Sequence, residues 1–201
     1  MMDTNSLSND AFDIPDREIE RLSTRLGAAA DSAGLLDVAY TEVDSPVGAL
    51  ILAATERGMV KVAFDSTPLD QVLDELAATV GTRLMRAPSR FDDAARQLGE
   101  YFSGSRREFA LPLDWRLASG FRLDVQRYLP QITYGSTASY AEVAQGVGNP
   151  RAVRAVGTAC AKNPLPIVVP CHRVVRSDGT LGNYAGGPEV KRELLELEAP
   201  R

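Results

Sequence analysis

Residues 139–157 read Ser-Tyr-Ala-Glu-Val-Ala-Gln-Gly-Val-Gly-Asn-Pro-Arg-Ala-Val-Arg-Ala-Val-Gly. The start, Ser139-Tyr-Ala-Glu142, is a capping box, in which the serine hydroxyl and the glutamate carboxylate satisfy free backbone donors at a helix start. This helix should stop around Gly146 to Gly148. Asn149 can then cap a second helix that begins at Pro150, where the missing proline N–H would have had no partner. Two short helices joined by a tight turn predict a helix-turn-helix.

The second predicted helix carries two arginines beside small residues. Arg151 and Arg154 are three positions apart and so share a face, and Ala152 and Ala155 leave little bulk beside them. Small residues permit close backbone approach, and cations favour grooves lined by phosphates. The same pattern also fits a solvated basic face on an ordinary core helix.

A cysteine and the chain's only histidine are neighbours further on. They lie in the run Ile167-Val-Val-Pro-Cys-His-Arg-Val-Val175, as Cys171 and His172. A thiol becomes a strong nucleophile only as thiolate, and imidazole is the side chain best able to take its proton near neutral pH. The pair therefore suggests a nucleophile with its base. The alternative is a buried strand whose cysteine packs as a small hydrophobe.

The first half of the chain predicts a small α+β domain. Alternating apolar residues between Asp37 and about Phe64, broken at Ser45–Gly48 and Arg57-Gly58, indicate antiparallel hairpin strands that include residues 38–43 and 49–53. Helical spacing then predicts helices over 68–80 and 92–102, and residues 107–113 are expected to return as a strand. In the second half, Phe121, Val125 and Leu129 form a helical stripe that ends near Pro130.

The first thirty-six residues are polar and acidic. Ile19, Leu22 and Leu26 form one apolar stripe at helical spacing between residues 16 and 30, which suggests one amphipathic helix. Such a helix could dock on the body or on a partner. The simpler interpretation is a frayed, solvated tail with a transient helix.

Composition bounds the class of protein. With 201 residues, 44% of them hydrophobic, and no apolar run near the ~18 residues of a membrane span, we expect a soluble globular chain of one or two domains. The N-terminus has no export signal and two cysteines give no disulfide framework, so the expected location is the cytoplasm, away from membranes.

Charge is divided unevenly along the chain. Residues 1–118 carry 12 Lys and Arg against 20 Asp and Glu, a net of −8, whereas residues 119–201 carry 10 against 7, a net of +3. The modest positive balance thus lies in the half that holds the motifs. If this half binds nucleic acid, affinity from phosphate neutralisation should be limited.

From Gly120 to Glu198 the chain resembles the O6-alkylguanine-DNA alkyltransferases, also called methylated-DNA-protein-cysteine methyltransferases. Several ordered motifs at compatible spacings carry the resemblance. They are Ser139-Tyr140, Gly148 to Gly157, Asn163-Pro164, Pro166 to Val175, Gly182 to Gly187 and Lys191 to Glu198.

The resemblance implies a fold and a division into domains. After an acidic extension over 1–36, residues 37–118 would form a ribonuclease-H-like domain. Residues 119–201 would form a mainly helical domain with a winged-helix-like helix-turn-helix, which binds DNA and carries the chemistry. The cysteine and histidine zinc ligands of some relatives are absent, so we expect no metal, and the chemistry needs no cofactor.

The implied activity is direct-reversal DNA repair. The alkyl group of O6-alkylguanine, and of O4-alkylthymine, would move irreversibly from double-stranded DNA to Cys171, once per molecule. By resemblance the second helix enters the minor groove, with Arg151, Ala152 and Ala155 at the DNA. Arg154 would fill the space left by an extruded guanine while Tyr140 helps to rotate its phosphate. The protein would act as a monomer, with clustering on DNA left open.

Roles in the chemistry are also implied by the resemblance. Cys171 would be the acceptor, His172 would take its proton through a water, and Glu198 would orient the imidazole. Tyr140 would donate to the departing oxygen and Lys191 would lie near the thiolate. Taken without the resemblance, Glu198 and Lys191 fit solvated helix surface, and Tyr140 fits an apolar ring beside a helix cap.

The substrate pocket is assigned in the same way. Tyr184 and Pro166 would line the alkyl pocket, and the Ala185 N–H would meet the O6 atom. The Val174 main chain would read the guanine edge, and Asn163 would brace the active-site turn, although it also fits a routine turn. Cys160 is expected near the pocket wall as a small buried spacer, with oxidation to a pair with Cys171 as a weaker hypothesis.

Two positions, Gln126 and Cys160, depart from the family pattern, the latter because it matches a site that is usually not cysteine. Gln126 stands where many relatives carry the tryptophan of a valine-tryptophan pair, so packing of the first C-terminal helix should change.

Two other functions compete with repair by alkyl transfer. One is a non-enzymatic damage sensor that binds and flips alkylguanine, and the other is a cysteine hydrolase.

Overall fold

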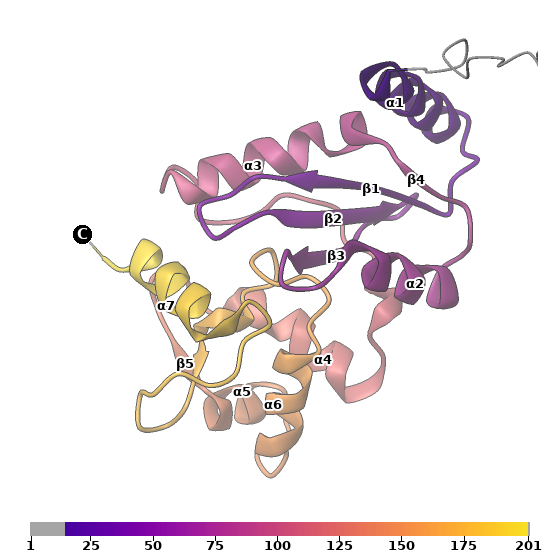
Figure 1. Cartoon of the computed structure of the whole chain (residues 1–201). Coiled ribbons are helices and arrows are strands. Elements are labelled where there is room, and N and C mark those ends of the chain that lie inside the picture. Colours follow the sequence, from indigo (N-terminus) through magenta and orange to yellow (C-terminus); the bar gives the residue numbers. More distant parts are fainter. Residues whose placement is uncertain (1–14, 201) are drawn as a thin grey trace, which may run out of the picture.

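The fold was obtained as a computed structural model, which describes residues 15–200; the first part of the expected acidic extension lies outside them. The described chain is α+β, as predicted. A small sheet with its helices forms the first half, and helices dominate the second half, which lies below the sheet in Figure 1. None of the helices between residues 15 and 200 has the length and apolar character that a bilayer crossing requires.

The sheet has four strands in the order β3-β2-β1-β4. They are β1 (Val38–Val43), β2 (Leu50–Thr55), β3 (Gly58–Phe64) and β4 (Leu84–Arg86). β2 pairs antiparallel with both β1 and β3, whereas β4 pairs parallel with β1. Every residue of β2 is buried, because both faces of this central strand are covered. The predicted hairpins are confirmed, but β4 was not predicted, since three residues give no usable periodicity.

Two helices cover the two faces of the sheet. α2 (Leu69–Thr79) buries Val72 and Leu76 against one face. α3 (Asp92–Phe102), entered through the 3-10 turn η2 (Pro88–Phe91), buries its apolar side in the core of the other face. That second core continues into the helical half of the molecule, so the two halves share one hydrophobic interior. Both helices were predicted from their periodicity.

The predicted strand over 107–113 is wrong. This segment is irregular and makes only an isolated bridge between Leu113 and Met59. Met59 donates its N–H to the carbonyl of Pro112 (2.8 Å) and accepts from the N–H of Asp114 (2.8 Å). Because Pro112 has no N–H, the pairing cannot extend as a regular ladder.

Helix α1 (Asp16–Ser32) corrects the expectation of a frayed tail. It packs on the body through Gly27, where a Cβ atom would lie 2.0 Å from the Arg86 carbonyl oxygen, and Asp31 pairs with Arg90 at 2.9 Å. The apolar stripe that suggested the helix does not make this contact. Its three members remain about half exposed: Ile19 (50%), Leu22 (48%) and Leu26 (59%).

The helical half begins after the 3-10 turn η3 (Trp115–Leu117). Its elements are α4 (Gly120–Tyr128), η4 (Leu129–Gln131), β5 (Ala138–Ser139), α5 (Tyr140–Gly146), α6 (Val153–Ala161), η5 (Cys171–Arg173), β6 (Val174–Val175) and α7 (Gly187–Glu198). β5 and β6 pair in parallel and bring the start of α5 beside η5. The predicted capping box is present, with both hydrogen bonds between Ser139 and Glu142 formed.

The second helix of the predicted helix-turn-helix starts later than expected. Asn149 does not cap a helix at Pro150; its carbonyl instead accepts the N–H of Ala152 (2.9 Å) in a turn. α6 begins at Val153, without a side-chain cap. The extra turn lengthens the connection after α5, which ends at Gly146 as predicted.

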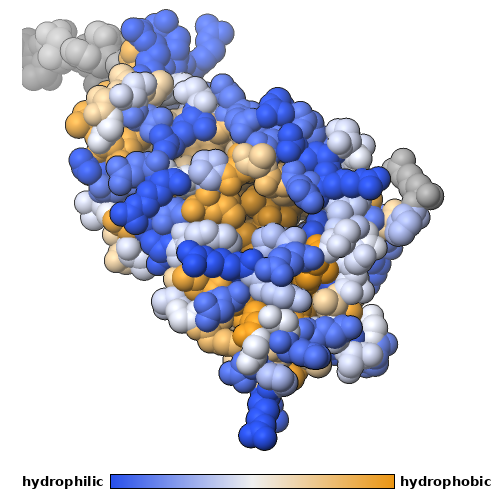
Figure 2. Space-filling view, turned by 180° about the vertical axis from the view of Figure 1, so that it is seen from behind, coloured by the Kyte–Doolittle hydropathy of each residue, from blue (hydrophilic) through white to orange (hydrophobic). Residues whose placement is uncertain are grey.

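The surface on the far side of the molecule is mixed in character. Figure 2 shows hydrophobic side chains gathered in a hollow near the middle of this face, with hydrophilic side chains around them. The lower tip, formed by the helical half, ends in hydrophilic side chains. Hydrophilic surface at this tip suits a contact with a polar partner better than burial in an apolar interface.

Candidate active site

The turn that carries Cys171 is held by one asparagine. The side-chain amide of Asn163 donates to the Val169 carbonyl (2.8 Å) and to the Cys171 Sγ atom (3.2 Å). Its carbonyl oxygen accepts the N–H of Leu165 (3.1 Å). Asn163 is buried, so these bonds also satisfy polar groups that water cannot reach. The arrangement fixes the sulfur at the start of η5.

The same turn stores backbone strain. Ile167 has φ 72°, the left-handed region that a β-branched residue rarely adopts, and its side chain is buried. Such a residue costs on the order of 1–3 kcal/mol and persists only where the surroundings enforce it. The bonds that Asn163 makes on both sides of Ile167 supply that enforcement.

His172 is fully buried and has a single hydrogen-bond partner. Its Nε2 atom lies 2.9 Å from Oε1 of Glu198 at the end of α7. Because a carboxylate only accepts, Nε2 carries the proton and Nδ1 is the basic nitrogen. Nδ1 has no partner among the described residues. The histidine is thus oriented by the carboxylate with a free acceptor on its other side.

Glu198 is the hub of a buried polar cluster. Arg173 donates to both of its oxygens, from Nε to Oε2 (2.8 Å) and from Nη2 to Oε1 (3.0 Å), and Tyr101 donates its hydroxyl to Oε1 (2.8 Å). Burial alone would raise the pKa of Glu198, but the hydrogen bonds from His172 and Arg173 outweigh burial and hold the pKa at about 2. Glu198 is therefore ionised at neutral pH and is not a solvated surface charge.

Burial favours the uncharged forms of both the Cys171 thiol and the His172 imidazole. Burial raises the pKa of Cys171 to about 11, although the Asn163 hydrogen bond and the nearby Lys191 ammonium act in the opposite direction. Burial also lowers the pKa of His172, against the effect of Glu198. Burial therefore works against a thiolate in the resting protein. This favours transfer of the thiol proton to Nδ1 as the sulfur reacts.

Lys191 lies inside the protein and not on the surface of α7. Its Nζ atom donates to the Val174 carbonyl (2.6 Å), and the residue is fully buried. Burial lowers the pKa of Lys191, while Cys171 and Cys160 oppose this. Cys160 is itself buried, and burial raises its pKa to about 12. The two thiols and this amine therefore influence one another's pKa values.

Two tyrosines approach the site from different elements. Tyr140, at the start of α5, is partly buried, and its pKa is raised by burial and by Cys160 and Cys171. A Cβ atom on Gly182 would lie 1.9 Å from its hydroxyl oxygen, so Gly182 makes room for the ring. The ring of Tyr184 meets the His172 ring edge-on, with 6.2 Å between centroids.

Only some of the residues expected to line the substrate pocket border the same cavity. Asn163, Pro166 and Ala185 border one cavity of about 280 Å³ between the two halves of the molecule. Residues that were not predicted complete much of its wall: Lys61, Val62, Ala63, Phe64, Thr67, Glu75, Leu117, Arg122, Ala161, Lys162 and Pro164. Tyr184, Val174 and Cys160 do not line this cavity. Cys171 is 3% exposed and does not line the cavity either, but its Sγ atom accepts a hydrogen bond from Asn163, which does.

The predicted nucleic-acid contacts lie in the connection between α5 and α6 and in the first turn of α6. Arg151 and Ala152 belong to the turn before α6, whereas Arg154 and Ala155 are exposed in its first turn. The two arginines therefore do not share one helical face, because the helix starts after Arg151. Both remain accessible beside small residues.

Gln126, the position expected to change the packing of the first C-terminal helix, lies on α4. It is fully buried, and its amide nitrogen donates to the carbonyls of Ala159 (3.2 Å) and Lys162 (3.3 Å) at the end of α6. Its Oε1 atom has no partner among the described residues. Gln126 thus ties α4 to the end of α6 by two hydrogen bonds.

The described residues contain no group of three or more His, Cys, Asp or Glu side chains placed to hold a metal ion. The acid, base and cation that do converge are Glu198, His172 and Arg173. Glu198 accepts hydrogen bonds from both of the other side chains.

Family models match both halves of the chain. Residues 38–115 match the model described as "6-O-methylguanine DNA methyltransferase, ribonuclease-like domain". Residues 120–200 match "6-O-methylguanine DNA methyltransferase, DNA binding domain".

Named relatives agree with these matches. A methylated-DNA–protein-cysteine methyltransferase of Mycolicibacterium paratuberculosis is 41% identical over 161 residues, which cover 80% of this chain and 92% of the relative. The constitutive Bacillus subtilis enzyme of that name is 39% identical, over 79% of this chain and 94% of its own. The crystal structure of Mycobacterium tuberculosis OGT in complex with DNA has a TM-score of 0.71 and 39% identity, covering 81% of this chain and 95% of that one.

Proposed function

This chain belongs to the 6-O-methylguanine DNA methyltransferase family, and we propose that it repairs DNA as a methylated-DNA–protein-cysteine methyltransferase that transfers the alkyl group of O6-alkylguanine to Cys171. The observation that carries the assignment is the orientation of His172. Nε2 is bonded to Glu198, and Nδ1 is a free acceptor directly after the cysteine in the chain. This is the arrangement that a thiol needs in order to lose its proton in a buried site.

The reaction is a displacement at the alkyl carbon. The Sγ atom of Cys171 forms the new C–S bond while the C–O6 bond breaks and its electron pair stays on the oxygen. The thiol proton passes to Nδ1 of His172, through a water, and the ionised Glu198 stabilises the resulting imidazolium. Tyr140 donates a hydrogen bond to the departing O6. The thioether has no easy leaving path, so each molecule reacts once. O4-alkylthymine presents the same kind of bond and is a second substrate.

Access to the sulfur requires an extruded base. Cys171 is 3% exposed, so a guanine stacked in a duplex cannot reach it. The helix-turn-helix of α5 and α6 binds double-stranded DNA through the minor groove, with Arg154 in the space vacated by the base. Arg151, Ala152 and Ala155 lie in the same connection and first turn of α6. Because the net charge of residues 119–201 is only +3, phosphate contacts alone give limited affinity.

The proposal divides the chain into three parts. Residues 1–36 form an acidic extension, residues 37–118 a supporting domain, and residues 119–201 the part that binds DNA and accepts the alkyl group. The protein acts as a cytoplasmic monomer and needs no metal or cofactor. Pro166, Ala185, Tyr184, Val174 and Cys160 form the surroundings of the flipped base.

A labelled oligonucleotide tests this function against its competitors. Incubation with duplex DNA containing radiolabelled O6-methylguanine should transfer one label per protein molecule to the peptide that contains Cys171. Binding without transfer would instead support a damage sensor that lacks enzymatic activity. Repeated turnover of a simple ester, with no label on the protein, would support a cysteine hydrolase.

Gly182→Ala probes the placement of Tyr140. The added methyl group would lie 1.9 Å from the tyrosine hydroxyl, so the ring must move. We expect the single-turnover rate of methyl transfer to fall by about 10- to 100-fold, since a misplacement near 1 Å has that effect on an aligned reaction. Gly99→Ala, on an exposed part of α3 with open space around it, is the control and should keep the wild-type rate.

A further inference from the structure

A residue of the supporting domain touches the catalytic carboxylate. Tyr101, at the end of α3, is fully buried, and its hydroxyl donates to Oε1 of Glu198 at 2.8 Å across 97 positions of sequence. The first half of the chain therefore does more than pack against the second. It supplies one of the hydrogen bonds that Glu198 receives.

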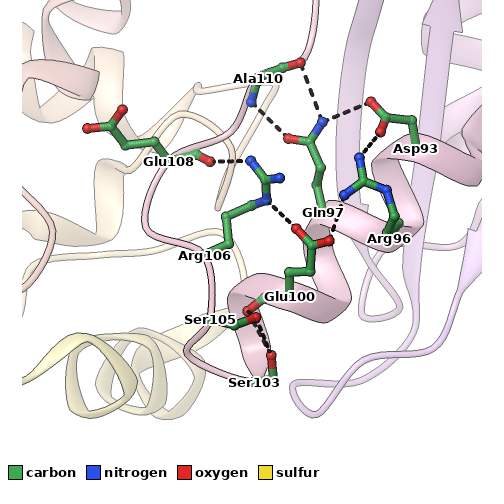
Figure 3. A network of polar contacts seen from close by, with 9 residues as sticks. All are labelled: Asp93, Arg96, Gln97, Glu100, Ser103, Ser105, Arg106, Glu108 and Ala110. Carbon is green, nitrogen blue, oxygen red and sulfur yellow. Dashed lines mark hydrogen bonds and ion pairs between the residues drawn. The ribbon is translucent and has the colours of Figure 1, made fainter.

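Helix α3 is held firmly at the position that this contact requires. Gln97, one turn before Tyr101, donates to Asp93 (2.8 Å) and to the Ala110 carbonyl (3.4 Å) and accepts the N–H of Ala110 (2.8 Å). Glu100 pairs with Arg106 at 2.7 Å. Figure 3 shows how these contacts tie the helix to the segment that follows it.

Aromatic neighbours fix the tyrosine ring as well. The rings of Phe102, Phe109 and Tyr134 lie 5.3, 5.3 and 6.3 Å from that of Tyr101, between centroids. A ring packed on several sides has little freedom to turn its hydroxyl elsewhere. The bond to Glu198 is thus a fixed feature of the fold.

Three donors share one carboxylate oxygen. Oε1 of Glu198 accepts from Tyr101 (2.8 Å), from Nε2 of His172 (2.9 Å) and from Nη2 of Arg173 (3.0 Å). Each donor withdraws electron density from the oxygen, so each weakens the pull of that oxygen on the other two protons. The hydroxyl of Tyr101 therefore bears directly on how strongly Glu198 holds the imidazole.

We propose that Tyr101 is a positioning residue for alkyl transfer, which sets the direction and the basicity of the Glu198 oxygen that orients His172. The expected change in the rate of alkyl transfer rests on the proposed function. The expected change in the pKa of His172 does not depend on that function. Tyr101 touches neither the base nor the sulfur. It acts through the carboxylate, from the domain that had no assigned part in the chemistry.

Removal of the Tyr101 hydroxyl should change the pKa of His172 in a predictable direction. Without Tyr101 as donor, Oε1 becomes more basic and holds the Nε2 proton more strongly, which favours the imidazolium and raises the pKa of His172. The other titratable or charged groups that face this cluster stay in place: Cys171, Arg173, Lys191, Tyr134 and Tyr184. Since transfer needs neutral imidazole as the proton acceptor, the acid limb of the rate profile should move to higher pH.

Tyr101→Phe in the full chain tests this directly, because the ring packing is kept. His172 is the only histidine, so its imidazole ¹⁵N resonances need no assignment. We expect the ¹⁵N titration midpoint of His172 to rise by about half to one pH unit, and the acid limb of single-turnover methyl transfer to shift equally. Tyr40→Phe, which removes a tyrosine hydroxyl from β1 beside the core on the other face of the sheet, is the control and should leave both midpoints unchanged.

A second replacement acts in the opposite direction and keeps the hydroxyl. 3-Fluorotyrosine at position 101 is a stronger donor, so the His172 midpoint should fall below the wild-type value. Unchanged midpoints in both replacements, or a shift in Tyr40→Phe as large as in Tyr101→Phe, would overturn the proposal. Failure of wild-type protein to take up methyl groups would overturn the proposed function alone, because the histidine titration is read without substrate.

Discussion

Cys171→Ser is expected to abolish methyl transfer, to below about one part in 10³ of the wild-type rate. The hydroxyl is a far weaker acid than the thiol and a poorer nucleophile at carbon. In a site that already raises the pKa of the thiol to about 11, ionisation of a serine is out of reach. The measurement is label per protein after prolonged incubation with methylated duplex DNA, together with DNA affinity, which should stay near the wild-type value.

Cys160→Ser is the matched control for this experiment. It makes the same atomic change at a second buried cysteine in the same electrostatic environment. The end point measures how many methyl groups each protein molecule has accepted and not the rate of transfer. This variant should therefore still take up one methyl group per molecule. Label on Cys171→Ser protein, or loss of the label in Cys160→Ser, would mean that the acceptor has been assigned to the wrong sulfur.

Local signals in the sequence were enough to place much of the fold. The capping box at Ser139 and Glu142 and the apolar face of residues 92–102 each depend on neighbours within a few positions, and the structure has both. The helix start expected at Pro150 is wrong for a related reason. An Asn-Pro pair satisfies a tight turn as well as a helix cap, and only the packing of α6 decides between them.

Contacts between elements that are distant in the sequence were out of reach for sequence reasoning. The stripe Ile19, Leu22 and Leu26 signalled a helix, but α1 docks through Gly27, whose role is the absence of a side chain. No periodicity reports such a close approach. The docked face of α1 is therefore known only from the structure.

The candidate site also has parts that the sequence shows and parts that only the structure shows. Cys171 and His172 are adjacent, so their pairing is visible in the sequence. Arg173 was quoted in that motif without a role, although a cation next to a buried turn needs a buried partner. Tyr101 gave a weaker signal still. It lies beside the predicted apolar face of its helix, and nothing local shows that its hydroxyl meets a carboxylate 97 positions away.

Glu198→Gln is expected to destabilise the protein by about 3 kcal/mol at neutral pH. The substitution keeps the shape of the side chain but removes the charge that compensates the buried Arg173. It also places amide N–H groups where Tyr101, His172 and Arg173 already donate, so donors face donors. Chemical denaturation of both proteins measures the difference. Glu196→Gln, exposed on the same helix, is the control and should change stability by less than about 0.5 kcal/mol.

The pH dependence of that difference tests its electrostatic origin. The pKa of Glu198 is lowered from 4.5 to about 2 in the folded protein. A carboxyl group with a depressed folded pKa contributes stability that is fully present above its unfolded pKa and is lost as the pH falls through the folded value. The gap between wild type and Glu198→Gln should therefore be constant above about pH 5 and narrow between pH 4.5 and pH 2. A gap that stays the same at low pH would assign the effect to altered packing and not to the charge that holds Arg173 and orients His172.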